Sequence, residues 1–530
     1  MSIIPPDART GTAPPPDDES SAGTESKSNN GKDSTAPGNA SLNDAKPAGT
    51  NSDEELTAEN KRTFAEMNAR HASVSVKGKF RVMTWLPDAQ YPFQSFAEFS
   101  SKADFQYINQ HPKIKFEVTE GTKTKTVRMG RGEWFLSRAR HTHFDGIDFS
   151  PGAPAIITRK DRRGKKTYYA NMFSGVSVEP REGDCSLYLN HVRDNICGGQ
   201  EVLNTYTLDW QASGVQYPAD PGRAAISLRG DPGVGKGIFA TEYGALFGRH
   251  FFHITNAEQI VGRFNALAAQ SIVQFADEAM FAGDRHAAQV LKTLVSEKTK
   301  VLELKGIDSI QIPNFCRYIF STNNKHPLRI EEKDRRYCSI YVERTHAKDK
   351  PYFVALLDQM KTGGRAALLD LLLKRDISKF NPEDIPSTSE LDTQKLLSAP
   401  IGDRVIISFA QDGYLPGALV DLGGEREDRP WIARARGPGF LFEEMRTRGS
   451  RSMQFMDELT LTDILKRWGF TRKPLGNQTG WAAPPLDQLR SKLNEKYPAI
   501  EWDHLDVKWG KAPPDNDISN PDDTGSDIPF

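Results

Sequence analysis

The chain has 530 residues, of which 37% are hydrophobic and 26% charged, and its formal net charge is −1. This length predicts about three domains, and the near-zero charge excludes a protein that coats nucleic acid through global basicity, so a nucleic-acid contact has to come from local clusters. No apolar run approaches the roughly 18 residues that span a bilayer, the N-terminus lacks the apolar core of a secretory signal, and four cysteines indicate a reducing compartment. We therefore expect a cytoplasmic protein with no membrane partner.

Composition divides the chain into five parts. Residues 1–65 are rich in Pro, Ser, Asn, Asp and Gly, which predicts a disordered tail. Residues 66–215 mix short β-like runs with helical patterns, and residues 216–390 alternate apolar runs with helices, as in an α/β domain built on a parallel sheet. Residues 391–508 contain a helix, hairpin and helix pattern typical of a winged-helix module. Residues 509–530 again have a disordered, acidic composition.

The mixed α/β part contains β-like runs at 114–120 and 167–173 and a helical pattern at 185–197. Between strands, the sequence KDRRGKK at 160–166 predicts a basic hairpin tip. This tip is either a solvated turn or a contact to the DNA backbone. Cys185 and Cys197 lack the spacing of a zinc site, so we interpret them as buried apolar residues.

The sequence RHTHFDGIDFSPG contains His141, His143, Asp145 and Asp148. A primase-polymerase needs closely spaced carboxylates that bind metal ions. Here the two aspartates are three residues apart rather than two, and no third acidic strand end follows. Too little chain precedes them for a polymerase domain, so we predict that this segment is a linker without primase activity.

The α/β part contains a phosphate-binding loop with the GxxxxGK pattern, which follows an apolar run at 224–228 and precedes a helical pattern. Its backbone N–H groups are expected to hold the phosphates of ATP at the start of a helix, and its lysine to reach the β- and γ-phosphates. The predicted nucleotide-binding residues are Gly230, Asp231, Pro232, Gly233, Val234, Gly235, Lys236 and Gly237.

Polar residues end two further apolar runs. Asp277 is expected to order Mg²⁺, and Glu278 to orient and deprotonate the water that attacks ATP. Asn323 is expected to hydrogen-bond that water or the γ-phosphate between the other two motifs. Arg335 and Arg336 are predicted to reach the γ-phosphate of a neighbouring subunit.

This ordered set of motifs resembles the superfamily 3 helicases, a branch of the AAA+ ATPases, and more closely the helicase domain of phage primase-polymerases. The resemblance covers about residues 140 to 500 and is strongest between 225 and 345. It implies ATP hydrolysis at the subunit interfaces of a ring, commonly a hexamer, that translocates on DNA. The family's loop is often similar to GKG, so Gly237 does not by itself mark an inactive site. Without a hydroxyl there, Mg²⁺ is expected to take a water and to bind more weakly.

A β-hairpin is predicted where KVLEL and SIQI flank KGID. In superfamily 3 helicases a hairpin at this position enters the central channel with a lysine at its tip, and Lys305 is the matching residue. The resemblance therefore implies a lysine that follows the phosphates of a single strand. In the C-terminal module, Arg490, Lys492 and Lys496 either dock DNA or serve ring packing or the docking of a partner.

The last residues, Asp527, Ile528, Pro529 and Phe530, resemble the acidic C-terminal tip of bacterial single-stranded-DNA-binding proteins. An aromatic ring beside a free carboxylate fits a pocket with a basic rim. The resemblance implies that the tail recruits host replication proteins. We therefore predict an ATP-dependent DNA helicase of a phage or mobile element, acting in a bacterial cytoplasm. Two alternatives stay open: an AAA+ loader that does not unwind DNA, and a catalytically silent DNA-binding scaffold that holds nucleotide.

Overall fold

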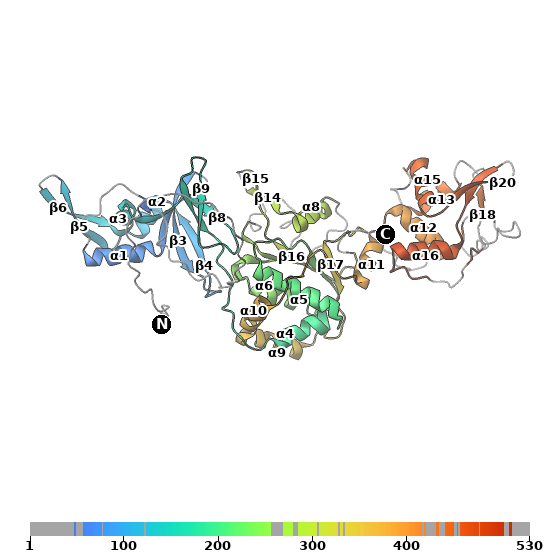
Figure 1. The fold of residues 1–530 in the computed structure, drawn as a ribbon, viewed down its shortest axis with the longest axis horizontal. Coiled ribbons are helices and arrows are strands. Elements are labelled where there is room, and N and C mark those ends of the chain that lie inside the picture. Colours follow the sequence, from blue (N-terminus) through green and yellow to red (C-terminus); the bar gives the residue numbers. More distant parts are fainter. Residues whose placement is uncertain are drawn as a thin grey trace, which may run out of the picture. The chain divides into compact units, whose positions relative to one another are not determined.

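The computed structural model of the chain is drawn in Figure 1. It describes residues 47–48, 57–76, 78–120, 123–255, 269–278, 285–304, 307–326, 329–331, 334–415, 418–419, 431–433, 440–449, 453, 456–475, 478–502 and 508–510. Within these ranges, no helix combines the length and the apolar character that crossing a bilayer requires. Most of the two tails predicted to be disordered lies outside these ranges, although a helix begins at Ala58, inside the first predicted tail.

The N-terminal part combines short helices with three small sheets. Its elements are β1 (Pro47–Ala48), α1 (Ala58–Asn68), β2 (His71–Val76), β3 (Lys79–Pro87), β4 (Ser95–Ser100), α2 (Lys102–Ile108), β5 (Lys113–Glu120), β6 (Lys123–Gly130), α3 (Arg131–Ser137), β7 (His141–Phe144), β8 (Gly146–Asp148), β9 (Ile156–Lys160) and β10 (Lys166–Asn171). The sheets have the strand orders β1-β7-β2-β3-β4, β8-β10-β9 and β5-β6. Alternating apolar residues such as Val74, Met83 and Phe144 are fully buried, which fixes which face of each strand packs inward.

The central part is an α/β unit. Its elements are α4 (Ser186–Asn190), the π-helical turn η2 (His191–Ile196), α5 (Glu201–Gln216), β11 (Ala225–Arg229), α6 (Lys236–Ala245), η3 (Gly248–His250), β12 (Phe251–Ile254), β13 (Val273–Asp277), α8 (Arg285–Ser296), β14 (Thr299–Leu304), β15 (Ile307–Pro313), β16 (Arg317–Thr322), β17 (Tyr337–Tyr341), α9 (Lys350–Gln359), η5 (Met360–Gly364) and α10 (Arg365–Lys374). Five strands form one sheet in the order β12-β13-β16-β11-β17, and every pair in it is parallel. A mixed α/β fold with a parallel sheet is thus present.

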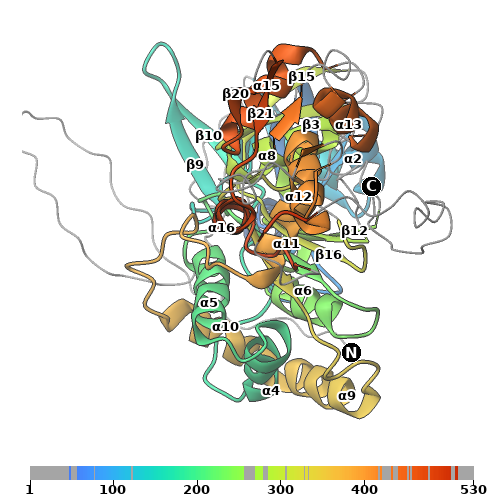
Figure 2. The same ribbon diagram turned by 90° about the vertical axis from the view of Figure 1, so that its right-hand side faces the viewer.

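The parallel sheet is buried on both faces, as such sheets require. On one face, alternate strand residues such as Ile226, Phe275 and Ile319 join an apolar core with residues of α5, α6 and α10. On the other face, residues such as Ala276 and Phe320 pack with α8. Helices α5 and α10 lie side by side, as do α4 and α9 (Figure 2). Strands β14 and β15 form a separate antiparallel hairpin.

The C-terminal part contains α11 (Ser389–Leu397), α12 (Ile401–Asp412), β18 (Ala418–Leu419), β19 (Trp431–Ala433), α13 (Phe440–Arg448), α15 (Glu458–Arg467), β20 (Thr471–Leu475), β21 (Gln478–Ala482) and α16 (Leu486–Lys496). Helix α15, the β20–β21 hairpin and α16 follow one another in the order predicted from the sequence. They enclose a core of their own with residues of α12 and α13.

Candidate functional site

The carboxyl ends of three neighbouring parallel strands bring the predicted motifs to one edge of the sheet. Strand β16 lies between β11 and β13, with Thr322 opposite Arg229 and Ser321 opposite Asp277. Two backbone bonds continue this pairing past the strand ends, from Gly230 N–H to the Thr322 carbonyl (3.2 Å) and from Glu278 N–H to the Ser321 carbonyl (2.8 Å). The predicted phosphate-binding loop and the acidic pair therefore flank the end of β16.

The loop between β11 and α6 depends on glycine for its shape. Gly235 has φ 99°, and a Cβ atom built there would lie 2.5 Å from His191 Cε1 and 2.9 Å from Phe353 Cε1. At Gly230 a Cβ would lie 2.5 Å from the Val342 carbonyl oxygen. Any side chain at either position would displace its neighbours. Helix α6 starts at Lys236, so the loop ends at a helix N-terminus, where backbone N–H groups favour an anion.

Lys236 is 6% exposed, and its ammonium group donates to the carbonyls of Gly230 (2.6 Å) and Asp231 (2.9 Å). Burial lowers the pKa of Lys236, while the nearby carboxylates of Glu278 and Asp277 act in the opposite direction. The lysine and the acidic pair thus share one electrostatic environment. A phosphate group placed between them would be attracted by the cation, and a metal ion by the acids.

The acidic pair faces solvent at the end of β13. The Asp277 side chain is 37% exposed, and its Oδ2 lies 3.7 Å from Nε2 of His253, whose ring stacks on Phe275. Glu278 is exposed and has φ 56°, a left-handed conformation that costs a residue with a side chain about 1–2 kcal/mol. Strain of this kind concentrates at functional sites. Here it re-aims the chain immediately after the strand.

Asn323 and Gly237 complete this edge. Asn323 is exposed directly after β16, while the next residue, Asn324, hydrogen-bonds the Thr322 hydroxyl. A Cβ at Gly237 would have no atom within 4 Å, so the position has room for a hydroxyl side chain although the sequence provides none. The donor set fits Mg²⁺ bound to a triphosphate: one carboxylate at Asp277, and otherwise oxygen from phosphate and water.

The two arginines lie at the opposite edge of the same sheet. The Arg336 carbonyl accepts from Ala225 N–H (2.7 Å) at the amino end of β11, and the Arg336 guanidinium contacts Asp334 (3.2 Å). Arg335 is exposed. The length of β11 separates this edge from the loop by about 13 Å. Within one chain, the fold does not bring Arg335 or Arg336 to the phosphate-binding loop.

The π-helical turn η2 contacts the loop and supports it. This contact was not predicted from the sequence. His191 is fully buried and contacts the Gly235 carbonyl through Nε2 (3.2 Å) and the Tyr352 hydroxyl through Nδ1 (3.1 Å). Asn195 donates to the Val234 carbonyl (2.7 Å). Burial lowers the pKa of His191 to about 4, so its ring is neutral near pH 7. Only the fold reveals these contacts, because η2 is about 40 residues from the loop in the chain.

A second support comes from the segment after β17. Arg344 forms an ion pair with Asp231 (2.9 Å), and Lys348 N–H donates to the Gly233 carbonyl (3.0 Å). The only signal in the sequence is that the polar run ERTHAKDK follows an apolar strand. Arg344 therefore places a cation beside the loop within the same chain, whereas Arg335 and Arg336 lie at the other end of the strands.

Some predicted residues lie outside the described part of the chain. The tip of the β14–β15 hairpin, with Lys305, is one of them, although the two strands pair as predicted, from Thr299 with Pro313 to Leu304 with Ile307. The C-terminal residues 527–530 are another. Their roles remain predictions.

The histidines and aspartates of segment 141–148 have internal partners. The Ser73 hydroxyl contacts both His141 (2.9 Å) and His143 (2.8 Å). Asp145 accepts from the backbone of Tyr168 (2.8 Å), and Asp148 pairs with an arginine of β9. Among the described residues, no group of three or more His, Cys, Asp or Glu side chains could hold a metal ion. Residues 141–144 and 146–148 form strands β7 and β8, which pair with β2 and β10. That the segment is a linker without primase activity stays a prediction.

The cations of α16 are also engaged. Arg490 is 8% exposed and donates to the Ala410 carbonyl (2.9 Å), Lys492 donates to the Arg467 carbonyl (2.6 Å), and Lys496 pairs with the fully buried Asp403 (3.0 Å). These bonds all lie within one chain, so the choice between DNA docking and ring packing or partner docking stays open.

Residues 228–336 match a family of unknown function, DUF5906. A DNA primase-polymerase of Nitratiruptor phage NrS-1 is 27% identical over 134 residues, which is 24% of this chain and 18% of that protein. The match therefore spans less than a fifth of the relative's length.

The fold is similar to solved structures from the same phage. An apo structure of the NrS-1 C-terminal region superimposes with a TM-score of 0.53 at 14% identity, covering 76% of this chain and 96% of that one. The A form of the apo C-terminal region superimposes with a TM-score of 0.54 at 13% identity, covering 78% of this chain and 95% of that one. The chain is thus similar in fold to most of the NrS-1 C-terminal region and, over a shorter stretch, similar in sequence to the NrS-1 primase-polymerase.

Proposed function

We propose that this chain is an ATP-dependent DNA helicase that acts in the replication of a phage or mobile element in a bacterial cytoplasm. One observation carries the proposal: the phosphate-binding loop and the acidic pair, some forty residues apart in sequence, flank the end of the same strand, β16. The sequence similarity to a phage primase-polymerase supports a role in replication. That protein's own activity is not carried over, since the match covers 18% of it.

The residues of this edge suit hydrolysis of ATP. The loop N–H groups and the α6 N-terminus bind the phosphates, and Lys236 neutralises charge that builds on them in the transition state. Asp277 holds Mg²⁺, which neutralises phosphate charge when bound. Glu278 accepts a proton from the attacking water and orients it, and Asn323 positions that water from the middle strand.

The opposite-edge position of Arg335 and Arg336 favours action between subunits. An arginine that stabilises the γ-phosphate charge in trans has to lie on a surface that a neighbour's nucleotide edge can meet. The exposed Arg335 meets this condition. We therefore propose a homo-oligomeric ring, a hexamer by resemblance, in which single-stranded DNA occupies the channel and Lys305 contacts its phosphates.

We also propose that the tail residues Asp527 to Phe530 recruit host replication proteins. The support is chemical: an aromatic ring and the terminal carboxylate of one residue fit a pocket with a basic rim. Deletion of Phe530 is expected to abolish the recovery of those host proteins in a pull-down. Equal recovery with the truncated chain would remove the tail from the account.

Strand displacement on a forked DNA substrate with ATP tests the function. We expect unwinding by the wild-type chain, none by Lys236→Ala, and ATP turnover without unwinding by Lys305→Ala. Lys298→Ala, which removes an exposed lysine just before β14, is the matched control and should unwind normally. Turnover without unwinding in the wild type would favour the loader alternative, and no turnover at all would favour the silent scaffold.

A further inference from the structure

The β9–β10 hairpin carries the largest local excess of positive charge among the described residues that the proposed function does not use. Its strands β9 and β10 pair antiparallel (Figure 2), and the register places Lys166 directly opposite Lys160. Residues 159–166 have the sequence RKDRRGKK, with six basic residues and one acidic residue. All of them are exposed.

The single carboxylate of the tip serves the backbone. Asp161 Oδ1 accepts from the N–H groups of Arg163 (2.8 Å) and Lys165 (2.9 Å), and the Asp161 N–H donates to the Lys165 carbonyl (2.9 Å). Gly164 supplies the φ of 80° that closes the turn. Asp161 therefore fixes the shape of the tip, and among the described residues no ion pair is recorded for it.

Five cations of the tip have no recorded ion pair with any residue that the structure describes. In the part of the chain that the structure describes, no ion pair is recorded for the side chains of Lys160, Arg162, Arg163, Lys165 and Lys166. Like charges directly opposite each other across a strand pair, as at Lys160 and Lys166, are destabilising. A fixed turn that concentrates repelling cations gains stability when an external polyanion binds it.

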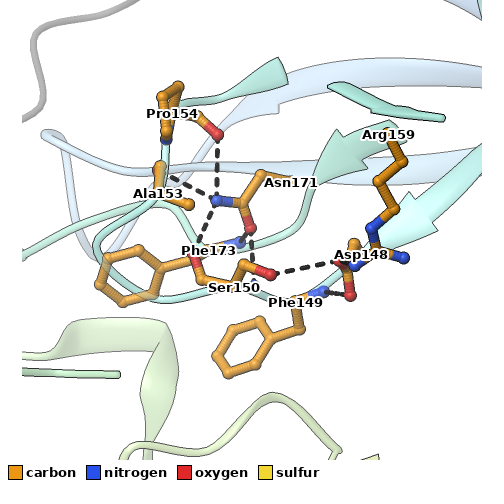
Figure 3. Close-up of polar contacts among 8 residues, drawn as sticks. All are labelled: Asp148, Phe149, Ser150, Ala153, Pro154, Arg159, Asn171 and Phe173. Carbon is orange, nitrogen blue, oxygen red and sulfur yellow. Dashed lines mark hydrogen bonds and ion pairs between the residues drawn. The ribbon is translucent and has the colours of Figure 1, made fainter. Parts of the chain in front are cut away.

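A network of polar contacts holds the base of the hairpin (Figure 3). Arg159 pairs with Asp148, which also accepts from the Ser150 hydroxyl (3.2 Å). The Asn171 side chain accepts from the backbone of Ser150 (3.0 Å) and Phe173 (3.1 Å), and its amide N–H groups donate to three backbone carbonyls between residues 150 and 154. These bonds tie the end of β10 to the segment that precedes β9.

Aromatic contacts connect this base to the parallel sheet of the central part, which carries the proposed ATP site. The rings of Phe149 and Phe173 lie 5.2 Å and 5.0 Å from the buried His250, just before β12. Phe149 also lies 6.0 Å from Phe315, which joins β15 to β16. The hairpin is therefore anchored beside the root of β14–β15, so a polyanion held at its tip stays tethered to the ATPase sheet.

We infer that the β9–β10 hairpin is an arm that binds the sugar–phosphate backbone of nucleic acid, in addition to the channel contact proposed for Lys305. The tip, residues 160–166, contains no apolar residue that could insert into a lipid surface, and no aromatic ring on which a base could stack. Its chemistry therefore fits phosphates without sequence readout. The arm goes beyond the proposed function, because no residue of the ATP site takes part in it.

The test measures the binding of the full-length chain to fluorescein-labelled DNA by anisotropy, over a series of salt concentrations, with single-stranded and duplex oligonucleotides of one length and an RNA of the same sequence. For Arg162→Ala with Arg163→Ala we expect about tenfold weaker binding that is independent of sequence. The salt slope should fall by about 1.4 for a single strand and about 1.8 for a duplex.

Two further variants separate charge from shape. Arg162→Lys with Arg163→Lys keeps both charges and should restore most of the affinity. Lys361→Ala with Lys379→Ala removes two exposed lysines from another surface and should bind as the wild type does. ATP turnover without DNA should be equal in all four proteins, so a failed ATPase and a failed arm are distinguishable.

Several results would overturn the inference. An unchanged affinity and salt slope in Arg162→Ala with Arg163→Ala would show that the hairpin does not bind nucleic acid. An equal loss of affinity in Lys361→Ala with Lys379→Ala would show the same, because the effect would then not be specific to the hairpin. Arm-dependent binding to phosphatidylserine vesicles without arm-dependent binding to DNA or RNA would assign the cations to a lipid surface instead.

Discussion

Two parts of the molecule are proposed to bind phosphate: the nucleotide edge, formed by the loop 230–237 with Asp277 and Glu278, and the β9–β10 arm. They are built in opposite ways. At the nucleotide edge, Gly230 and Gly235 have backbone or ring atoms within 3 Å of where a Cβ would be, and the cation is buried. In the arm, Gly164 has no atom within 4 Å, and every cation is exposed. The first site is specified by shape and the second by charge. Substitutions should therefore affect them differently.

Gly235→Ala should have the largest effect. The new Cβ would collide with His191 and Phe353 at a φ of 99°, which we expect to cost about 2–5 kcal/mol in the free energy of unfolding. ATP affinity, measured with a fluorescent analogue, should fall at least tenfold. Gly237→Ala lies in α6 with open space around the new Cβ and should be neutral or raise the free energy of unfolding by up to about 1 kcal/mol. Equal tolerance at both positions would show that shape does not specify the loop.

Acidification should loosen the nucleotide edge through His191. Its pKa is about 4 in the folded chain against 6.5 for an ordinary histidine, so the unfolded state binds the extra proton first. The stability contributed by the neutral ring is complete above pH 6.5 and is lost as the pH falls to about 4, by roughly 3 kcal/mol in total. In urea unfolding, His191→Gln should have a shallower pH dependence than the wild type across this window. Parallel pH profiles would mean that His191 is not kept neutral by the fold.

Much of the fold was predictable, because strand periodicity and the GxxxxGK loop are local signals. The strand at 225–229 overlaps the apolar run at 224–228, and the hairpin strands at 299–304 and 307–313 extend KVLEL and SIQI by a few residues. The strands at 273–277 and 317–322 end at Asp277 and just before Asn323, where the two further apolar runs were predicted to end. The order of the strands was not predictable in this way, since it depends on packing between distant segments. The bracing of the loop by His191 and Asn195 was missed for the same reason.

Charge patterns alone were ambiguous. The basic residues of α16 and those of 160–166 look similar in the sequence, yet Arg490 and Lys496 have internal partners and the hairpin cations have none recorded in the described chain. A partner such as the buried Asp403 is about 90 residues away in the chain, so only the fold reveals it. Arg335 and Arg336 gave no sign in the sequence that they would lie at the far edge of the sheet.

Gly237→Ser should have an intermediate effect, which concerns the Mg²⁺ dependence of ATP turnover at the nucleotide edge and not the shape of the loop. The position has room for the side chain, and a hydroxyl there can replace a water on Mg²⁺. We expect the Mg²⁺ concentration for half-maximal ATP turnover to fall several-fold. Titration of Mg²⁺ at saturating ATP measures this, and an unchanged midpoint would mean that residue 237 does not face the metal.

Gly164→Ala in the arm should have the smallest effect. A non-glycine residue at φ 80° costs about 1–2 kcal/mol locally, but no atom lies within 4 Å of the new Cβ and no charge is lost. Affinity for DNA should stay within about twofold of wild type, while Arg162→Ala with Arg163→Ala loses about tenfold. A larger loss of DNA affinity in Gly164→Ala than in Arg162→Ala with Arg163→Ala would show that the arm binds through its shape rather than through its charge.

The account depends most on hydrolysis of ATP at the edge where Lys236 meets the acidic pair, and Glu278→Gln tests it directly. The substitution keeps the size of the side chain and removes the base, so the variant should bind ATP and Mg²⁺ with wild-type affinity and turn ATP over at least about 100-fold more slowly. Wild-type turnover by Glu278→Gln, or no ATP binding by the wild-type chain, would contradict the account.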